Sequence, residues 1–343
     1  MHWKARPSVA LAVILIALPA CDNVEWEGID LRLAAPSDTS IWSAPEGEDE
    51  EAAPEAMDLG PVLYKVERSA SGGRAIPVAR ITDDGFAPLP DQDEAPDMPE
   101  RFRNDLLAPG AELVLLLEGR RAGTFVVFEE GEPETSYCLP RPTATGAVEV
   151  AQWADGAETF LAVAKDPEAP VLHDPTRSTT ELPGDPAVVS VDLANRVLSM
   201  SEAPWPPSVP DIVRDVRVAS FPRAGAPFLA ASLVQDDELA PGEAPGSAYS
   251  IFYMASPVPA EDGYRIHWFW YQRADGGGKA WPRLIGALDG PPSAPDAILL
   301  ELVGEGDRSF AVVAGEGGDW SFLLTEPCAS HDEVDITGSE WQE

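Results

Sequence analysis

Basic side chains are scarce in this 343-residue sequence, and lysine is the scarcer of the two. Only 23 residues are Lys or Arg, against 59 Asp or Glu, which gives a formal net charge of −36. A chain this acidic is repelled by nucleic-acid phosphates and by an anionic membrane surface, so we expect no nucleic acid among its partners. Proline is abundant instead, with 35 residues, and this excludes a fold built mainly from long helices.

Short catalytic motifs are also missing. The sequence contains no Gly-x-Ser-x-Gly, Ser-x-x-Lys, His-Glu-x-x-His, Cys-x-x-Cys or Gly-x-x-x-x-Gly-Lys pattern, which are typical of hydrolases, metal sites and phosphate-binding loops. Histidine is rare, with 4 residues, and their positions do not follow a zinc-ligand spacing. We therefore expect no metal and no cofactor, and a non-catalytic protein is favoured over an enzyme.

The first twenty residues have the features of an export signal. Lys4 and Arg6 precede an apolar run over 9–18, which is too short to span a bilayer. The motif at 18–21, Leu-Pro-Ala-Cys, resembles the lipobox of bacterial lipoproteins. That resemblance implies cleavage before Cys21, attachment of lipid to its thiol and acylation of its new amino group, with palmitate as a typical fatty acid. Several acyl chains anchor a protein stably in the lipid bilayer.

The anchor predicts the location of the protein. We expect it in the cell envelope, held on a bacterial membrane by Cys21 and facing the periplasm or the cell surface. An ordinary secreted protein, cleaved nearby and with Cys21 free, is the alternative. Asp22 follows the lipidation site directly, but rules that assign inner or outer membrane from this position differ between bacterial groups, so both membranes stay open.

Composition divides the rest of the chain. Residues 21–60 are predicted to form the lipid anchor and an acidic tether rich in Pro and Ala, because like charges and proline extend a chain. Residues 61–330 carry the apolar runs of a folded β domain, and 331–343 form an acidic tail. If the body holds two domains, the proline cluster at 166–186 is where we expect the division.

Two cysteines remain in the body, Cys138 and Cys328. In an oxidising envelope a leftover pair of this kind predicts a disulfide. The alternative is two buried free thiols.

From residue 61 onwards, short apolar runs alternate with Gly, Pro and Asp, which predicts an antiparallel all-β fold built from meanders. One short helix is expected over 99–107, where Asp97 is placed to cap it and Pro99 suits its first turn. Residues 297–303 fit either a helix or a strand, and a strand is slightly favoured. The predicted strands are 62–66, 75–81, 112–117, 124–128, 147–153, 159–164, 187–191, 216–220, 228–234, 249–255, 264–272, 283–288, 309–314 and 320–325.

An internal repeat refines this prediction. The hexapeptide at 206–211 recurs at 291–296, and each copy is followed by a strand that begins with Phe and another that begins with an aromatic residue and Ser. Repeated meanders must stack on one another, most often as a propeller. The copies at 206–255 and 291–325 resemble degenerate blades of the FG-GAP/VCBS type, without the calcium-loop acids of those families. Two packed β-sandwich domains are the alternative.

The most unusual segment is the aromatic stretch at 264–273. As a strand it places tryptophan side chains on one face and His and Tyr side chains on the other. Because both faces are aromatic, we expect both to be covered by the core. The alternative is that one face lines a groove that stacks on sugar rings or a peptide, and the candidate groove residues are His267, Trp268, Trp270 and Tyr271.

Taken together, the sequence favours a membrane-anchored envelope lipoprotein that acts as a non-catalytic binding or scaffold module for a protein or glycan ligand. One alternative is a glycan-active hydrolase or lyase that uses carboxylates and aromatic stacking. Another is an envelope-assembly lipoprotein.

Overall fold

The computed structural model describes residues 59–83, 85–91, 94–117, 120–165, 182–221, 227–235, 248–258, 263–274, 280–288, 295–304, 307–316, 319–326 and 336–338. The chain divides into two compact units, residues 1–54 and 55–343, and all described residues belong to the second. The predicted signal peptide, Cys21 and nearly all of the tether lie outside the described residues, as does Cys328. No helix in the described part combines the length and the apolar character needed to span a bilayer.

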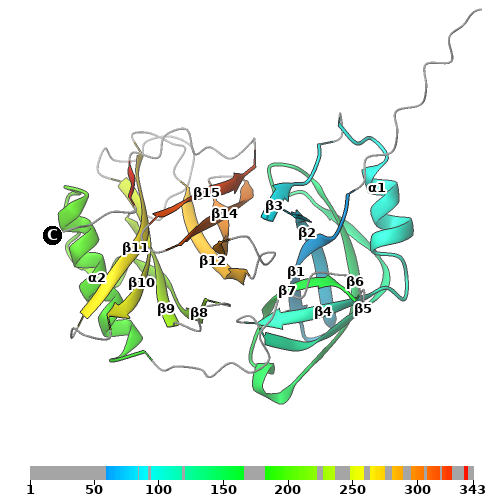
Figure 1. Ribbon diagram of the computed structural model, residues 1–343, viewed down its shortest axis with the longest axis horizontal. Helices are drawn as coiled ribbons and strands as arrows, with labels where there is room; N and C mark the ends of the chain where they lie inside the picture. Colours follow the sequence, from blue (N-terminus) through cyan, green and yellow to red (C-terminus); the bar gives the residue numbers. More distant parts are fainter. Residues whose placement is uncertain are drawn as a thin grey trace, which may run out of the picture. The chain divides into compact units, whose positions relative to one another are not determined.

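The first part of the body is a barrel-like sheet (Figure 1). Its strand order is β1-β7-β4-β5-β6-β2-β3, and because β1 also pairs with β2, six of the strands form a closed ring from which β3 extends. Every pairing between its strands is antiparallel. The strands are β1 (Val62–Ser69), β2 (Gly72–Thr82), β3 (Gly85–Pro88), β4 (Glu112–Leu117), β5 (Arg120–Glu134), β6 (Arg141–Val150) and β7 (Thr159–Ala164).

A short helix packs its apolar side against the barrel interior. Helix α1 (Met98–Arg101) continues directly into the π-helical turn η1 (Phe102–Leu106), which confirms the helix expected over 99–107. Phe102 is fully buried among barrel residues, with its ring 6.5 Å from that of Tyr64 in an edge-to-face arrangement. The period-2 alternation of β1 directs Tyr64 and Val66 into this interior core.

The second part of the body contains two sheets that face each other. The five-stranded sheet has the order β16-β11-β10-β9-β8, and the four-stranded sheet the order β12-β13-β14-β15. The strands are β8 (Val213–Ser220), β9 (Pro227–Gln235), β10 (Ala248–Val258), β11 (Gly263–Ala274), β12 (Trp281–Leu288), β13 (Asp296–Val303), β14 (Arg308–Glu316), β15 (Asp319–Thr325) and β16 (Ile336–Gly338).

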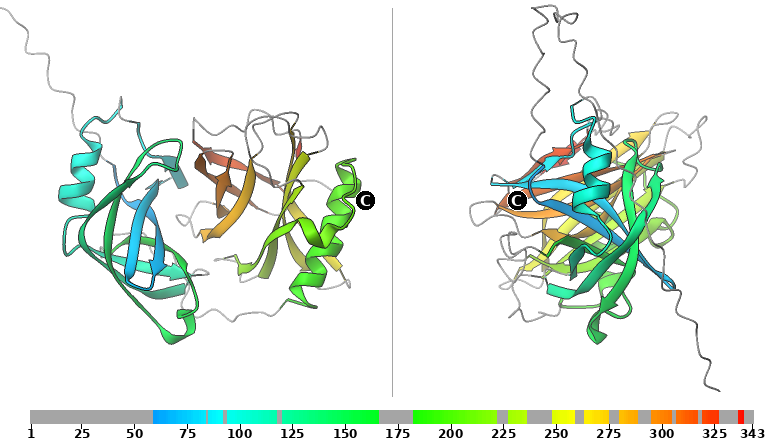
Figure 2. Two further views of the ribbon diagram at one scale, coloured as in Figure 1. Left: turned by 180° about the vertical axis from the view of Figure 1, so that it is seen from behind. Right: turned by 90° about the vertical axis from the view of Figure 1, so that its right-hand side faces the viewer.

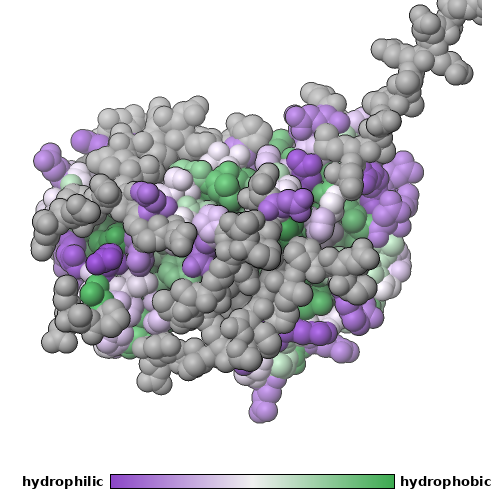
Figure 3. All heavy atoms as spheres, viewed as in Figure 1, coloured by the Kyte–Doolittle hydropathy of each residue, from purple (hydrophilic) through white to green (hydrophobic). Residues whose placement is uncertain are grey.

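These sheets lie in layers (Figure 2), and a separate apolar core fills each space between neighbouring layers. One core fills the space between the five-stranded and the four-stranded sheet. A second lies between the four-stranded sheet and the outer wall of the barrel. A third is formed by the other face of the five-stranded sheet and helix α2 (Pro186–Met200). The small elements η2 (Gln152–Ala154) and α3 (Val209–Ile212) complete the described structure, and hydrophilic residues cover much of the described surface seen in Figure 3.

Most predicted strands are confirmed, but the strand expected at 187–191 is wrong. This segment is the first part of helix α2, in which the Asp185 carboxylate accepts a hydrogen bond from the backbone N–H of Ala187 at 2.9 Å, and Pro186 occupies the first turn. The helix buries Leu193, Val197 and their neighbours on one side. The three valines at the start of the helix favoured the prediction of a strand, whereas the buried side chains follow the period of a helix.

The repeated segments do not form propeller blades in the described structure. The copy at 206–255 supplies β8, β9 and β10 to the five-stranded sheet, whereas the copy at 291–325 supplies β13, β14 and β15 to the four-stranded sheet. Their inner faces share one core, an arrangement that follows the sandwich alternative for this part of the chain. The antiparallel all-β class is confirmed, and the segment 297–303 is strand β13. The proline-rich stretch at 166–186 falls between β7 and α2.

Candidate functional site

The aromatic residues proposed for a groove lie in the core instead. Trp268 and Trp270 are fully buried between the two facing sheets, and their rings meet Phe322 edge-on. Tyr271, on the other face of β11, is buried beneath α2. His267 is partly exposed and lies edge-on to Phe221. Both faces of β11 are therefore covered, as the core interpretation expected, and the three buried rings cannot stack on a ligand.

A cavity of about 390 Å³ lies elsewhere, beside α1 and the start of β6. Its walls come from three separate segments: the chain after β3, helix α1, and the turn that leads into β6. Most of the wall is apolar, and only two of its residues carry a charge. The lining residues are Leu89, Pro90, Asp91, Met98, Leu139, Pro140, Arg141 and Pro142. Cavities of this size and polarity are typical of small-molecule sites.

Arg141 holds one wall of this cavity in place. It is 2 % exposed, and its Nη1 donates a 2.9 Å hydrogen bond to the carbonyl of Pro77 in β2. Its Nη2 forms an ion pair with Glu326, and its guanidinium lies over the ring of Tyr137 at 5.5 Å. Burial lowers the pKa of Arg141 to about 10, so it stays protonated at neutral pH. Within the described structure, its Nε has no hydrogen-bond partner.

The opposite wall is shaped by a turn. Asp91 Oδ1 accepts a 2.8 Å hydrogen bond from the backbone N–H of Glu94, and the Asp91 carbonyl accepts one from Ala95 at 3.0 Å. This capped turn leads into α1, where Met98 is buried against both the barrel core and the cavity. The cavity is therefore held by hydrogen bonds on two sides, which favours a preformed site.

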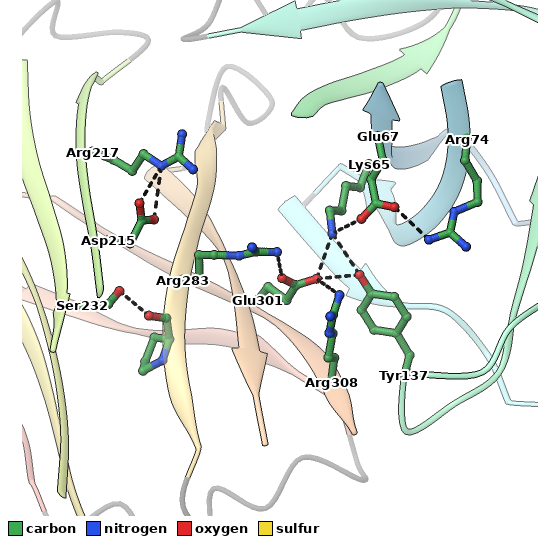
Figure 4. Close-up of polar contacts among 11 residues, drawn as sticks. Lys65, Glu67, Arg74, Tyr137, Asp215, Arg217, Ser232, Arg283, Glu301 and Arg308 are labelled. Atoms are coloured by element: carbon green, nitrogen blue, oxygen red, sulfur yellow. Dashed lines mark hydrogen bonds and ion pairs between the residues drawn. The ribbon is translucent and has the colours of Figure 1, made fainter. Parts of the chain in front are cut away.

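A second polar centre lies between the barrel and the four-stranded sheet (Figure 4). Lys65 of β1 and Glu301 of β13 are both 0 % exposed, and Lys65 Nζ lies 2.8 Å from Glu301 Oε1. The Tyr137 hydroxyl donates to the same oxygen at 2.6 Å. Arg283 Nη2 binds Oε2 of Glu301, and Lys65 also contacts Glu67 at 2.8 Å.

The charges of this buried cluster shift the pKa values of its members. Burial alone would raise the pKa of Glu301, but the positive charges of Lys65 and Arg283 outweigh it and hold the pKa below its usual value. Burial, together with the Glu301 carboxylate, raises the pKa of Tyr137. Burial of Glu67 is likewise outweighed by hydrogen bonds from Lys65 and Arg74, which lower its pKa to about 2.

The cluster contains the residue types of an acid–base site, but solvent does not reach its central carboxylate. Both carboxylate oxygens of Glu301 are occupied by protein donors, and solvent does not reach them. Glu67 continues the network to Arg74 at 2.8 Å, and Arg74 reaches Glu134 at 2.6 Å. The cluster thus joins β1, β2 and β5 of the barrel to the four-stranded sheet.

Only one cysteine of the predicted pair, Cys138, belongs to the described residues. Cys138 follows β5, and its Sγ lies 3.7 Å from Oε2 of Glu326. Its predicted partner Cys328 lies outside the described residues, so the disulfide stays a prediction. In the described ranges, no group of three or more His, Cys, Asp or Glu residues is placed to hold a metal ion.

Comparison with known proteins gives no relative: no family model, curated protein or solved structure matches the chain. The interpretation of the site therefore depends on its own geometry.

Sequence reasoning missed both the cavity and the buried cluster, although each left a local signal. Lys65 is the one charged residue within the apolar run 62–66, and Glu301 interrupts a run of leucines at 299–302. A lone charge in a buried strand predicts a buried ion pair, but not its partner. The cavity walls contain two Leu-Pro pairs, at 89–90 and 139–140, and nothing in the sequence indicates that these pairs meet.

Proposed function

We propose that this protein is a lipid-anchored envelope protein that binds a ligand without transforming it. The observation that carries the proposal is the cavity of about 390 Å³ beside α1, walled mainly by leucine, methionine and proline. Prolines and hydrogen-bonded turns keep such a wall rigid, so little conformational entropy is lost when a ligand enters.

The chemistry of the cavity favours an apolar ligand. Its one fully buried charge, Arg141, is already neutralised by Glu326, and a second anion brought there would have to displace a paired carboxylate. The walls instead offer area for hydrophobic contact, worth roughly 25 cal/mol for each Å² removed from water. An apolar small molecule or the apolar side chains of a peptide fit this description.

The lipobox resemblance at Cys21 supports the membrane location. Acylation there would hold the binding domain on the bilayer through the acidic tether, whose charge repels an anionic membrane surface. Replacing Cys21 with Ala should move the protein from the membrane fraction to the soluble fraction. If membrane fractionation of Cys21→Ala is unchanged, the anchor assignment is wrong.

Binding can be tested with the apolar fluorophore N-phenyl-1-naphthylamine. We expect saturable fluorescence enhancement with the wild-type protein and at least a tenfold weaker affinity for Leu139→Trp, because the larger ring fills the cavity. Leu323→Trp is the matched control, since Leu323 is an exposed residue of β15 and does not line the cavity. Circular dichroism checks that both variants fold. Equal affinity in wild type and Leu139→Trp, or no saturable binding at all, would refute the proposal.

The two alternatives receive less support from the geometry. A glycan-active enzyme was expected to stack sugar rings on Trp268 and Trp270, and both side chains are fully buried. An envelope-assembly role calls for a partner protein, which crosslinking in intact envelopes would identify. No described surface favours that role over ligand binding.

A further inference from the structure

A second cavity, of about 270 Å³, lies apart from the apolar one and differs from it in character. It is bounded by the segment that precedes β7, by β8 and by β12, and none of these elements lines the apolar cavity. Two of its lining residues are arginines, Arg217 of β8 and Arg283 of β12. In a chain with 23 basic residues against 59 acidic ones, a cavity lined by two guanidinium groups is unusual.

Each guanidinium group is paired with a carboxylate. Arg217 Nε lies 3.0 and 3.1 Å from the two oxygens of Asp215, and Arg283 Nη2 binds Glu301. Figure 4 shows the two arginines with these partners. The carboxylates fix the direction of the side chains, as supporting residues do in preformed binding sites.

Both arginines keep N–H groups that no described residue uses. Only Nε of Arg217 is engaged, so its two terminal nitrogens lack a partner in the described ranges. Nε of Arg283 is shielded from solvent and has no hydrogen-bond partner there either. The side chain of Arg217 is largely exposed, so an acceptor that enters the cavity can reach its terminal nitrogens.

The remaining lining groups are consistent with a small anion. Thr159 contributes a hydroxyl, Gly156 leaves space, and Leu117 and Leu284 form an apolar rim. Glu158 also lines the cavity. Since Asp215 and Glu301 each pair with one of the arginines, an anion would be held by the unused N–H groups of Arg217 and not by a net positive charge.

From this arrangement we infer that the cavity between Arg217 and Arg283 binds a small oxyanion, either a phosphate or a carboxylate group. The planar fork of arginine matches both groups and binds them through paired, charge-assisted hydrogen bonds. The inference is independent of the apolar cavity and concerns a different ligand class.

Isothermal titration calorimetry with inorganic phosphate and with citrate tests the site. We expect saturable binding of at least one probe by the wild-type protein, and at least a tenfold weaker affinity for Arg217→Gln. Binding of phosphate alone assigns the site to phosphates, binding of citrate alone assigns it to carboxylates, and binding of both assigns it to oxyanions in general. Higher sodium chloride should weaken the binding, because the arginines are partly exposed and salt screens them.

Arg103→Gln is the matched control, because Arg103 is an exposed arginine paired with Glu130 and lies outside the cavity. A second variant, Thr159→Val, keeps the charges and should weaken binding several-fold. Arg217 is preferred to Arg283 for the main test, because its side chain is 59 % exposed and its loss spares the buried cluster. Naphthylamine binding should be the same in Arg217→Gln as in wild type, which separates this site from the apolar one. If neither probe binds, or if Arg217→Gln binds like wild type, the inference is wrong.

Discussion

Both faces of the four-stranded sheet are covered, but the two interfaces differ in chemistry. Along β13, Ala297 and Leu299 face the barrel, while Ile298 and Leu300 face the five-stranded sheet. The barrel face also carries Glu301, together with Arg283 and Arg308 of the same sheet and Glu326 directly after β15. The opposite face carries no charge among the residues of its core.

Hydrogen bonds at the two interfaces differ accordingly. On the apolar side, serine hydroxyls of the five-stranded sheet donate to backbone carbonyls. Ser232 donates to Pro282 of β12, and Ser250 donates to Ala280, which precedes β12, both at 2.5 Å. On the barrel side, backbone groups form hydrogen bonds across the interface. Cys138 N donates to Arg308 O, and Arg308 N donates to Ser136 O, both at 2.8 Å. An ionic interface requires each charge to meet its partner, so it specifies one arrangement, whereas an apolar interface depends on shape.

The largest effect should come from the predicted disulfide on the ionic side. If Cys138 and Cys328 are bonded, Cys138→Ala should lower the free energy of unfolding of the oxidised protein by up to about 5 kcal/mol, because the bond closes a long loop. Urea denaturation measures this, and the difference from wild type should shrink under reducing conditions. Alkylation of two free thiols in the unfolded, unreduced protein would contradict the pairing.

Breaking the ionic interface at its centre should cost almost as much. Glu301→Ala removes the counter-ion of Arg283 and leaves Lys65 paired with Glu67 alone, and removal of one partner from a buried pair costs about 3–5 kcal/mol. The control is Glu130→Ala, which removes an exposed ion pair with Arg103 and should cost no more than about 1 kcal/mol. Equal losses in the two variants would show that the cluster is not buried.

The apolar interface should respond to volume and not to charge. Leu300→Ala opens a cavity in a fully buried position and should cost about 2–5 kcal/mol in urea denaturation. This loss should be the same at pH 7 and pH 4, because Leu300 is uncharged and belongs to a cluster of apolar side chains. Leu323→Ala, at an exposed position of β15, should change stability little.

The ionic interface should also make the free energy of unfolding depend on pH, which is a smaller effect. The pKa of Glu67 is lowered from 4.5 to about 2 in the folded protein, so its contribution is complete above pH 4.5 and is lost as the pH falls towards 2. Unfolding free energies measured between pH 7 and pH 2.5 should therefore fall below pH 4.5, and Glu67→Gln should make that fall shallower. Glu149→Gln, at an exposed position of β6, is the control, and an equally shallow curve for it would refute the assignment.

Local sequence patterns predicted much of this fold. Short apolar runs between Gly, Pro and Asp located nearly all of the strands, and Asp97 with Pro99 located the helix after β3. The pattern failed at α2, because its first turn is rich in valine and only burial of Leu193 and Val197 shows the helical period. The repeat at 206–211 and 291–296 marked equivalent meanders correctly in position, but not their assembly into two facing sheets.

Sites were harder to predict than strands, because a site needs residues that are distant in the sequence. The turn at 139–142 and Met98 line the apolar cavity, and Arg217 and Arg283 line the polar one. The sequence by itself determined the acidic charge, the β class and most of the strand positions, since each depends on composition or on neighbouring residues. Only the tertiary structure decided that the first sheet closes, that β11 lies inside the core and that Lys65 pairs with Glu301, because strand partners are chosen by long-range packing.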